Sequence, residues 1–383
     1  MALHFTREEF DDRIARVRRR LDEDRLDGLL MFAQESMYYL TGYDTFGFCF
    51  FQCLYLGADG RLALLTRSAD LRQARHTSII DDIRIWTDEK GARPETQLKD
   101  MLDSLGARGR RLGIELDSYG LTAFHGKALD AALDGFCTLE DASDLVARVR
   151  VVKSPAEIAY VRRAGELGDA ALAAGADVTA AGADEGAILA AMQGEIFRGG
   201  GDYPGNEFII GSGRDALLCR YKAGRRKLDA SDQLTLEFAG VYRHYHAALM
   251  RTLIVGEPSP RHKAMHGACV EALGACEAVL RPGSTAGAVF EAHARVMDDA
   301  GFRDHRLNAC GYSLGAKFTP SWMDWPMFYR GNDAELAAGM VFFAHMILMD
   351  STSGHAMTLG RSYVLTEAGP EPLSAASLDL IVK

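Results

Sequence analysis

The sequence has no long apolar run and few cysteines, and each absence narrows the class of protein. The longest apolar stretch, residues 46–57, is too short to cross a bilayer and contains Gln52. The first twelve residues are polar and acidic, so no secretory signal is expected. The seven cysteines are odd in number and scattered, without the spacing of a zinc ribbon or a redox motif. We therefore expect reduced thiols and a cytoplasmic protein without a membrane span.

The chain also has fewer basic than acidic residues. The chain has 43 lysines and arginines against 53 aspartates and glutamates, a net charge of -10. Nucleic acid is therefore not expected as a main partner, because phosphate binding needs a basic face. No Gly-x-Gly-x-x-Gly or Walker-type loop is present, so nucleotide binding has no support either. The class of function that remains is one that acts on a small-molecule substrate.

The length of 383 residues indicates two domains. Residues 1–150 alternate short strands with helices, which is typical of an α/β sandwich. Residues 151–383 open with Ser154, Pro155 and Glu157, which supply an N-cap, a first-turn proline and a capping-box glutamate for a long helix. A second helix, a strand, a hairpin, two more helices and further strands follow. The predicted fold class is thus an α/β domain followed by an α+β domain.

The most informative stretch is residues 233–255, which predicts a β-hairpin. Apolar and polar residues alternate up to Ala239, and a second apolar strand runs from Tyr245 to Val255. With Tyr242-Arg243 as the turn, Glu237 lies opposite Ala248. The same face also carries His244, His246 and Met250. Burying a carboxylate and imidazoles unpaired is costly, so they face each other or a ligand. The alternative is a structural Glu-His pair.

The pattern Glu-x-Ala-Gly-x-Tyr-x-x-Tyr-His-x-x-Leu-x-Arg-Thr, from Glu237 to Thr252, resembles the pita-bread family. This family contains methionine aminopeptidase, Xaa-Pro aminopeptidase, prolidase, creatinase and ectoine hydrolase. The resemblance implies a creatinase/prolidase-like α/β domain over residues 1–150 and a pita-bread domain over residues 151–383. The chain resembles the metal-free branch more, and ectoine hydrolase most, where a Glu and a Tyr-His pair occupy the same frame.

The metallopeptidases of this family bind two metal ions through two Asp, one His and two Glu. The resemblance places these five ligands at Glu237, Ala248, Tyr312, His345 and Gly360. Only one of the four carboxylates remains, and methyl or hydrogen side chains cannot ligate a metal. We therefore expect neither a metal nor another cofactor.

Hydrolysis of a C–N bond without metal needs a base to activate water or a nucleophile, and an acid for the leaving nitrogen. His246 is the base or shuttle with Glu237 as its orienter, or Glu237 is itself the nucleophile; the sequence leaves both open. His345, at a former ligand position, is the third catalytic candidate. The alternatives are a core histidine satisfied by a carbonyl for His246, and a strand histidine buried against methionines for His345.

The substrate-binding candidates are Arg220, Tyr312, Trp322, Trp325, His244 and Glu207. Arg220 stands where relatives place a substrate-facing histidine, and an arginine there can hold a carboxylate in a bidentate fork. Its alternative role is in a solvated basic loop with Lys222, Arg225, Arg226 and Lys227. The aromatic candidates would cage a cationic substrate through cation–π contacts, or simply pack.

These residues together indicate a metal-independent hydrolase that opens a C–N bond in a small zwitterionic, cyclic amidine, guanidino or amide compound. Two alternatives stay open. One is a metal-dependent Xaa-Pro dipeptidase or aminopeptidase with an altered ligand set, and the other is a non-catalytic protein that binds a small ligand. The segment Phe48–Gln52 resembles one that reaches the partner's active site in relatives, which implies a homodimer.

Overall fold

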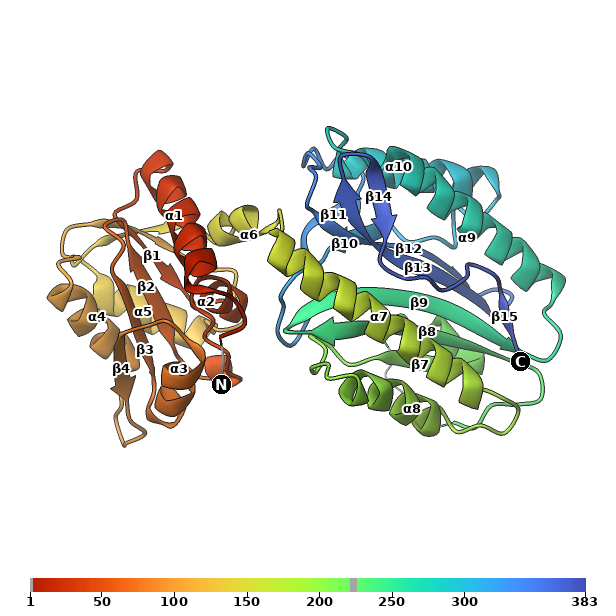
Figure 1. The fold of residues 1–383 in the computed structure, drawn as a ribbon, viewed down its shortest axis with the longest axis horizontal. Coiled ribbons are helices and arrows are strands. Elements are labelled where there is room, and N and C mark those ends of the chain that lie inside the picture. The colour runs from red at the N-terminus through yellow and green to blue at the C-terminus, as the bar shows by residue number, and fades with distance from the viewer. Residues whose placement is uncertain (1–2, 221–225) are drawn as a thin grey trace. The chain divides into compact units, whose positions relative to one another are not determined.

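The computed structural model describes residues 3–220 and 226–383, and the chain divides into two compact units, Met1–Arg150 and Val151–Lys383 (Figure 1). Lys222 and Arg225, assigned above to a basic loop, lie outside the described residues. No helix in the described part is long and apolar enough to cross a membrane.

Unit 1 is a mixed β-sheet between two helical layers. Its strands are β1 (Gly28–Met31), β2 (Cys53–Gly57), β3 (Leu62–Arg67), β4 (Asp82–Trp86), β5 (Arg111–Ile114) and β6 (Thr138–Asp141), in the order β4-β3-β2-β1-β5-β6. Its helices are α1 (Arg7–Glu23), α2 (Gln34–Thr41), α3 (Leu71–Thr77), α4 (Pro94–Ser104), α5 (Ala123–Leu133) and α6 (Leu145–Arg150), with short 3-10 turns at Gly47–Cys49 and Ser68–Asp70. Because strand side chains alternate, Leu30 packs in the core against α4 and α5, while Leu29 and Met31 pack against α1 and α2.

The segment Phe48–Gln52 is only partly a surface element. Phe51 and Gln52 are buried within unit 1, and the Gln52 amide donates a hydrogen bond to Gln34 at 2.9 Å. Phe50, by contrast, is 41% exposed. Cys49 and Phe50 are therefore the residues of this segment that a partner would meet most readily.

Unit 2 is built around a larger sheet (Figure 1). Its strands are β7 (Ile209–Ser212), β8 (Asp232–Tyr242), β9 (Tyr245–Val255), β10 (Ala309–Ser313), β11 (Asp324–Tyr329), β12 (Val341–Asp350), β13 (His355–Thr366), β14 (Gly369–Pro372) and β15 (Ile381–Val382). The main order is β11-β10-β12-β13-β9-β8-β7, with β14 paired to β13 and β15 to β9. Its helices are α7 (Pro155–Val178), α8 (Glu185–Arg198), α9 (Pro260–Val279) and α10 (Ala286–Asp299), and a 3-10 turn spans Gly213–Leu217.

The two helix pairs cover different halves of this sheet (Figure 1). Helices α7 and α8 lie along β7, β8 and β9, whereas α9 and α10 lie along the strands from β13 to β11. Helix α7 begins at the predicted capping box, in which Ser154 and Glu157 each accept the other's backbone N–H. It approaches β8 so closely that a Cβ on Gly240 would lie 1.8 Å from the Ala164 carbonyl oxygen. The glycine of the hairpin pattern is thus required by helix packing.

The hairpin forms where it was predicted, but its turn lies one residue later. Arg243 and His244 form the two-residue turn with φ of 52° and 64°, the left-handed conformation that matches the twist of the strands. Glu237 therefore pairs with Met250, and the predicted pairing with Ala248 is wrong. Since the error is two residues along the partner strand, His246, Ala248 and Met250 still share the face of Glu237, whereas His244 lies in the turn.

The segment predicted as an aromatic loop around residues 322–329 is only partly a loop. Strand β11 occupies Asp324–Tyr329 and pairs with β10, and the register of this pair is irregular. Trp322 precedes the strand, whereas Trp325 lies within it. The two tryptophans consequently have different surroundings.

Candidate functional site

Glu237 and Tyr312 come together although their strands are far apart in the sheet. Glu237 lies on β8 and Tyr312 on β10, with β9, β13 and β12 between them. Nevertheless, the Tyr312 hydroxyl donates a hydrogen bond to Glu237 Oε1 at 3.3 Å. Neighbouring strands are about 4.8 Å apart, so a flat sheet would hold these side chains beyond reach. The sheet therefore curves around the site, and its concave face carries the carboxylate.

Trp322 fixes the direction of this hydrogen bond. Its indole Nε1–H donates to the Tyr312 hydroxyl oxygen at 2.8 Å. An indole nitrogen is a donor only, so the phenol oxygen accepts from Trp322 and its own single proton points to Glu237. The chain Trp322 to Tyr312 to Glu237 thus runs in one direction, and it anchors Oε1 of the carboxylate.

The surroundings of Glu237 favour its neutral form more than water does. Its side chain is 8% exposed, and burial raises its pKa to about 7, while the charge of Arg220 and the hydrogen bond from Tyr312 act in the opposite direction. Burial raises the pKa of Tyr312 well above its ordinary value, and the Glu237 carboxylate raises it further. Tyr312 is consequently a neutral phenol, and Glu237 exchanges its proton near neutral pH.

His345 faces the same group from β12. Its ring centroid lies 5.6 Å from that of Tyr312 and 5.4 Å from that of Phe343. Burial lowers the pKa of His345 to about 3, with smaller contributions from the charges of His293 and Arg220. Its Nδ1 is buried and has no hydrogen-bond partner among the described residues. His345 is therefore a neutral imidazole that lies beside Tyr312.

Arg220 and Cys219 border this group from the loop before β8. The charge of Arg220 is strong enough at the site to shift the pKa values of Glu237, Tyr312 and His345. Its guanidinium contacts Met323 Sδ at 3.9 Å, next to Trp322 in the chain. The Cys219 thiol has its pKa raised by burial and by the Glu237 carboxylate. The loop thus contributes one cation and one neutral thiol to the surroundings of Glu237.

His246 is not placed to act as a base, which corrects its predicted role. Its Nε2 accepts a hydrogen bond from the Gly205 N–H at 2.8 Å, and its Nδ1 lies 3.4 Å from the Gly315 carbonyl oxygen. The side chain is fully buried, and burial lowers its pKa to about 3. Both ring nitrogens are therefore engaged by backbone groups. The alternative of a structural core histidine describes it better.

Trp325 and His244 also lie in surroundings other than those predicted for a substrate site. Trp325 packs against the core under α9 and α10. His244 lies in the hairpin turn with its ring stacked on Phe318 at a centroid distance of 4.3 Å. Glu207 is exposed just before β7, and its role in substrate binding stays a prediction. Of the aromatic candidates, Tyr312 and Trp322 belong to the group around Glu237, joined through their polar atoms.

Comparison with known proteins shows the family to which the chain belongs. Residues 159–367 match the model of metallopeptidase family M24, which is more than half of the chain, and residues 13–152 match the creatinase/prolidase N-terminal domain. The chain belongs to the M24 family. It is 29% identical over 404 residues to ectoine hydrolase of Halomonas elongata, covering 100% of this chain and 99% of that protein. It is also 29% identical over 393 residues to an uncharacterized hydrolase/peptidase of Sinorhizobium fredii, with coverage of 100% and 99%.

The fold of this M24 protein is shared with solved prolidases. The prolidase of Thermococcus sibiricus superposes with a TM-score of 0.88 at 19% identity, covering 98% of this chain and 99% of that one. The creatinase-like N-terminal domain and the pita-bread domain predicted from the sequence are thereby confirmed. The chain is accordingly a hydrolase of this family, which also includes ectoine hydrolase and Xaa-Pro dipeptidases among its relatives.

The residues of this M24 protein do not fit a two-metal centre. Within residues 3–220 and 226–383, no three His, Cys, Asp or Glu side chains converge as metal ligands would. At Gly360, a Cβ would lie 2.6 Å from ring carbons of Phe343 and 2.9 Å from Met250 Cβ. The space of a ligand side chain at that position is thus filled by apolar groups, and two divalent cations would lack the carboxylates that they prefer.

Phe343 and Cys219 were not singled out from the sequence. Phe343 pairs with Tyr312 across β12 and β10, so it lies under the phenol that reaches Glu237. The sequence pointed to Phe343 only indirectly, because a glycine at position 360 leaves room for a large neighbouring side chain. Cys219 directly precedes Arg220, but a single cysteine in a loop carries no chemical pattern.

Proposed function

We propose that this M24 protein is a metal-independent hydrolase that cleaves a C–N bond in a small zwitterionic, cyclic amidine, guanidino or amide compound. The observation that carries the proposal is Glu237, a buried carboxylate with a pKa of about 7 that is held by Tyr312 and flanked by Arg220 and His345. The full-length similarity to ectoine hydrolase supports the substrate class.

In this proposal Glu237 acts as the general base. A base is most effective when its pKa lies near the working pH, and about 7 meets that condition. Glu237 takes a proton from water, and the water oxygen bonds to the carbon of the scissile C–N bond. The bond then breaks with its electron pair on nitrogen, which takes the proton back from Glu237. The carboxylate is regenerated, and the products are an amine and an acyl compound.

The neighbouring groups have separate roles in this scheme. The Tyr312 hydrogen bond anchors Oε1, which leaves Oε2 to accept the water proton. Neutral His345 offers a ring N–H to the oxygen or nitrogen that gains negative charge during attack. Arg220 holds a carboxylate of the substrate in a bidentate contact, which orients the scissile bond.

The first experiment compares the wild type with Glu237→Gln on a panel of ectoine, other cyclic amidines, guanidino compounds, N-acyl amino acids and Xaa-Pro dipeptides. We expect turnover of a member of the first four classes by the wild type and none by Glu237→Gln. The control is Glu257→Gln, because the Glu257 side chain is 85% exposed and pairs only with Lys263 in the described structure. Full activity of Glu237→Gln would remove the assignment.

Mass spectrometry distinguishes the general-base role proposed here from the nucleophile role that the sequence left open for Glu237. Attack by Glu237 itself would leave the acyl group bound to its carboxylate, and intact mass during turnover would show the adduct. The general-base route predicts an unmodified chain. Cleavage of Xaa-Pro dipeptides alone would instead favour the peptidase alternative.

We further propose a homodimer and a cytoplasmic location. The exposed Phe50 supports a partner contact, and the seven free cysteines agree with a reducing compartment. Light scattering of the wild type and Phe50→Asp tests the dimer, because the charge would weaken a contact through this side chain. An unchanged mass in both proteins would show that Phe50 is not in an interface.

A further inference from the structure

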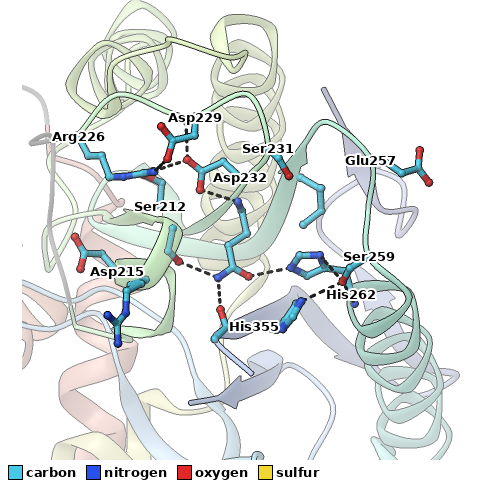
Figure 2. Close-up of a pocket in the computed structure, with 15 residues that line it drawn as sticks. Ser212, Asp215, Arg226, Asp229, Ser231, Asp232, Glu257, Ser259, His262 and His355 are labelled. Atoms are coloured by element: carbon cyan, nitrogen blue, oxygen red, sulfur yellow. Dashed lines mark hydrogen bonds and ion pairs between the residues drawn. The ribbon is translucent and has the colours of Figure 1, made fainter. Parts of the chain in front are cut away.

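The β8–β9 hairpin is tied to neighbouring segments at both of its ends. At the open end a polar cavity of about 630 Å³ lies beside Gln233, whose amide donates to the carbonyl oxygens of Gly213 and Gly354 at 2.8 Å each (Figure 2). His262 of α9 lies 3.0 Å from the amide oxygen of Gln233. Since Gln233 precedes Glu237 by four residues, or about 13 Å along the strand, this end lies outside the group around Glu237.

The turn end of the hairpin meets a different segment, residues 202–208, which connects α8 to β7. The Asp202 N–H donates to the Val241 carbonyl oxygen near the turn at 3.1 Å. At its other end the segment enters β7, where Ile209 pairs with Glu237. The segment therefore runs from the hairpin turn to the strand position beside Glu237, and both of its ends are fixed.

His246 holds the middle of residues 202–208. Its Nε2 accepts from the Gly205 N–H at 2.8 Å, so this nitrogen carries no proton. The single proton of the neutral ring is then on Nδ1, 3.4 Å from the Gly315 carbonyl oxygen, which also accepts from the His246 backbone N–H at 3.3 Å. Because the His246 ring is completely buried and shares the face of Glu237, it joins residues 202–208 to that face of the sheet.

Gly205 and Asn206 in turn hold the backbone at Trp322. A Cβ on Gly205 would lie 2.9 Å from the Trp322 backbone nitrogen and 3.0 Å from the Ser321 carbonyl carbon, so the two backbones are in direct contact. Asn206 Oδ1 accepts from the Trp322 backbone N–H at 3.3 Å. A displacement of Gly205 therefore displaces the residue whose indole donates to Tyr312.

We propose that His246 is a positioning residue for Glu237. It holds Gly205 against the backbone of Trp322, and the Trp322 indole then keeps the Tyr312 hydroxyl on the carboxylate. A neutral imidazole suits this role, because its acceptor and its donor lie on different edges of one ring and can join two backbone segments at once. The effect of His246 on turnover rests on the proposed function, whereas its effect on Trp322 does not.

The test follows the Trp322 indole N–H by NMR in the full-length protein labelled with ¹⁵N-tryptophan. The Trp322 signal is assigned by its absence in Trp322→Phe. The Trp86 indole donates to the Phe51 carbonyl oxygen at 2.8 Å in unit 1 and serves as the internal reference. Loss of the hydrogen bond to Tyr312 should move the Trp322 proton signal upfield and speed its exchange with water about tenfold.

Two substitutions of His246 form a matched pair. In His246→Asn the amide remains near Gly315 but is too short to reach Gly205, so we expect a displaced Trp322 signal. The side chain of His246→Gln is one methylene longer and offers an oxygen to the Gly205 N–H, so the wild-type signal should return. His262→Asn is the control, because it removes a buried ring at the far end of the hairpin and should leave the Trp322 signal in place.

Gly205→Ala perturbs the same contact from the other side and leaves His246 intact. The added Cβ presses on the Trp322 backbone nitrogen, so the Trp322 signal should move as it does in His246→Asn. Gly267→Ala in α9 is the matched control, since a Cβ there meets nothing within 4 Å. An unchanged Trp322 signal in either His246→Asn or Gly205→Ala would overturn the proposal.

Turnover separates the positioning role from the proposed function. With the substrate found in the panel, kcat should fall about tenfold in His246→Asn while KM stays unchanged, because Arg220 still binds the substrate. His246→Gln should recover kcat, which a general loss of stability would not explain. A displaced Trp322 signal with an unchanged kcat would support the positioning of Trp322 and contradict Glu237 as the base.

Discussion

Replacement of Tyr312 by Phe tests the anchored carboxylate most sharply. The Tyr312 hydrogen bond lowers the pKa of Glu237 against the larger effect of burial, so its loss raises that pKa. A hydrogen bond to a charged group contributes about 1.5 kcal/mol at the low end, which suits a contact of 3.3 Å. Since 1.36 kcal/mol corresponds to one pH unit, the acidic limb of the kcat/KM profile should move up by about one unit.

The structure also supplies a matched control and a second variant. Tyr363→Phe removes a buried hydroxyl that donates to Glu277 at 2.5 Å, outside the site, and should leave the acidic limb in place. Trp322→Phe removes the donor that directs the Tyr312 proton, so it should shift the limb in the same direction by less. In Tyr312→Phe the buried indole N–H loses its acceptor, which costs about 1–3 kcal/mol of stability. An acidic limb that stays in place in Tyr312→Phe would refute the reasoning.

Three further outcomes follow from the same structure. Glu237→Gln should abolish turnover yet raise the free energy of unfolding at pH 8 by about 3 kcal/mol, because the native state no longer holds a carboxylate with a raised pKa. Chemical denaturation measures this change, and a lower free energy of unfolding would contradict the raised pKa of Glu237. Arg220→Ala should raise KM for a carboxylate substrate about ten- to a hundredfold, with little rescue by Lys, while Arg330→Ala, a 67% exposed control, should not. The buried neutral His246, with a pKa of about 3, contributes stability that is complete above pH 6.5 and is lost as the pH falls, by about 2 kcal/mol at pH 5. If the free energy of unfolding depended on pH equally in the wild type and in His246→Gln, this contribution would be refuted.

The hairpin shows what the sequence could predict. Alternation of apolar and polar residues located β8 and β9 and assigned their faces, because a two-residue slip preserves the side of the sheet. The turn at Arg243 and His244 was missed, since neither residue type signals the left-handed conformation as Gly or Asn does. Periodicity thus predicted the faces of the strands but not their register.

The site depended on contacts that local patterns do not encode. His246 resembled a base, but its nitrogens meet the backbone at Gly205 and Gly315, 41 and 69 residues away in the chain. The contact between Tyr312 and Glu237 follows from curvature of the whole sheet. Trp322 and Trp325, three residues apart, lie in different surroundings because a strand begins between them. The sequence therefore predicted which residue types belong to the site, but it did not predict which residues they contact.

Treatment with a chelator tests whether Glu237 drives hydrolysis without a metal ion. Turnover of the substrate found in the panel is followed for protein of known metal content, before and after treatment with a chelator. We expect a near-empty protein whose turnover is the same in both samples. Loss of turnover with the chelator, and its recovery on addition of Mn²⁺ or Zn²⁺, would contradict the account and favour the peptidase alternative.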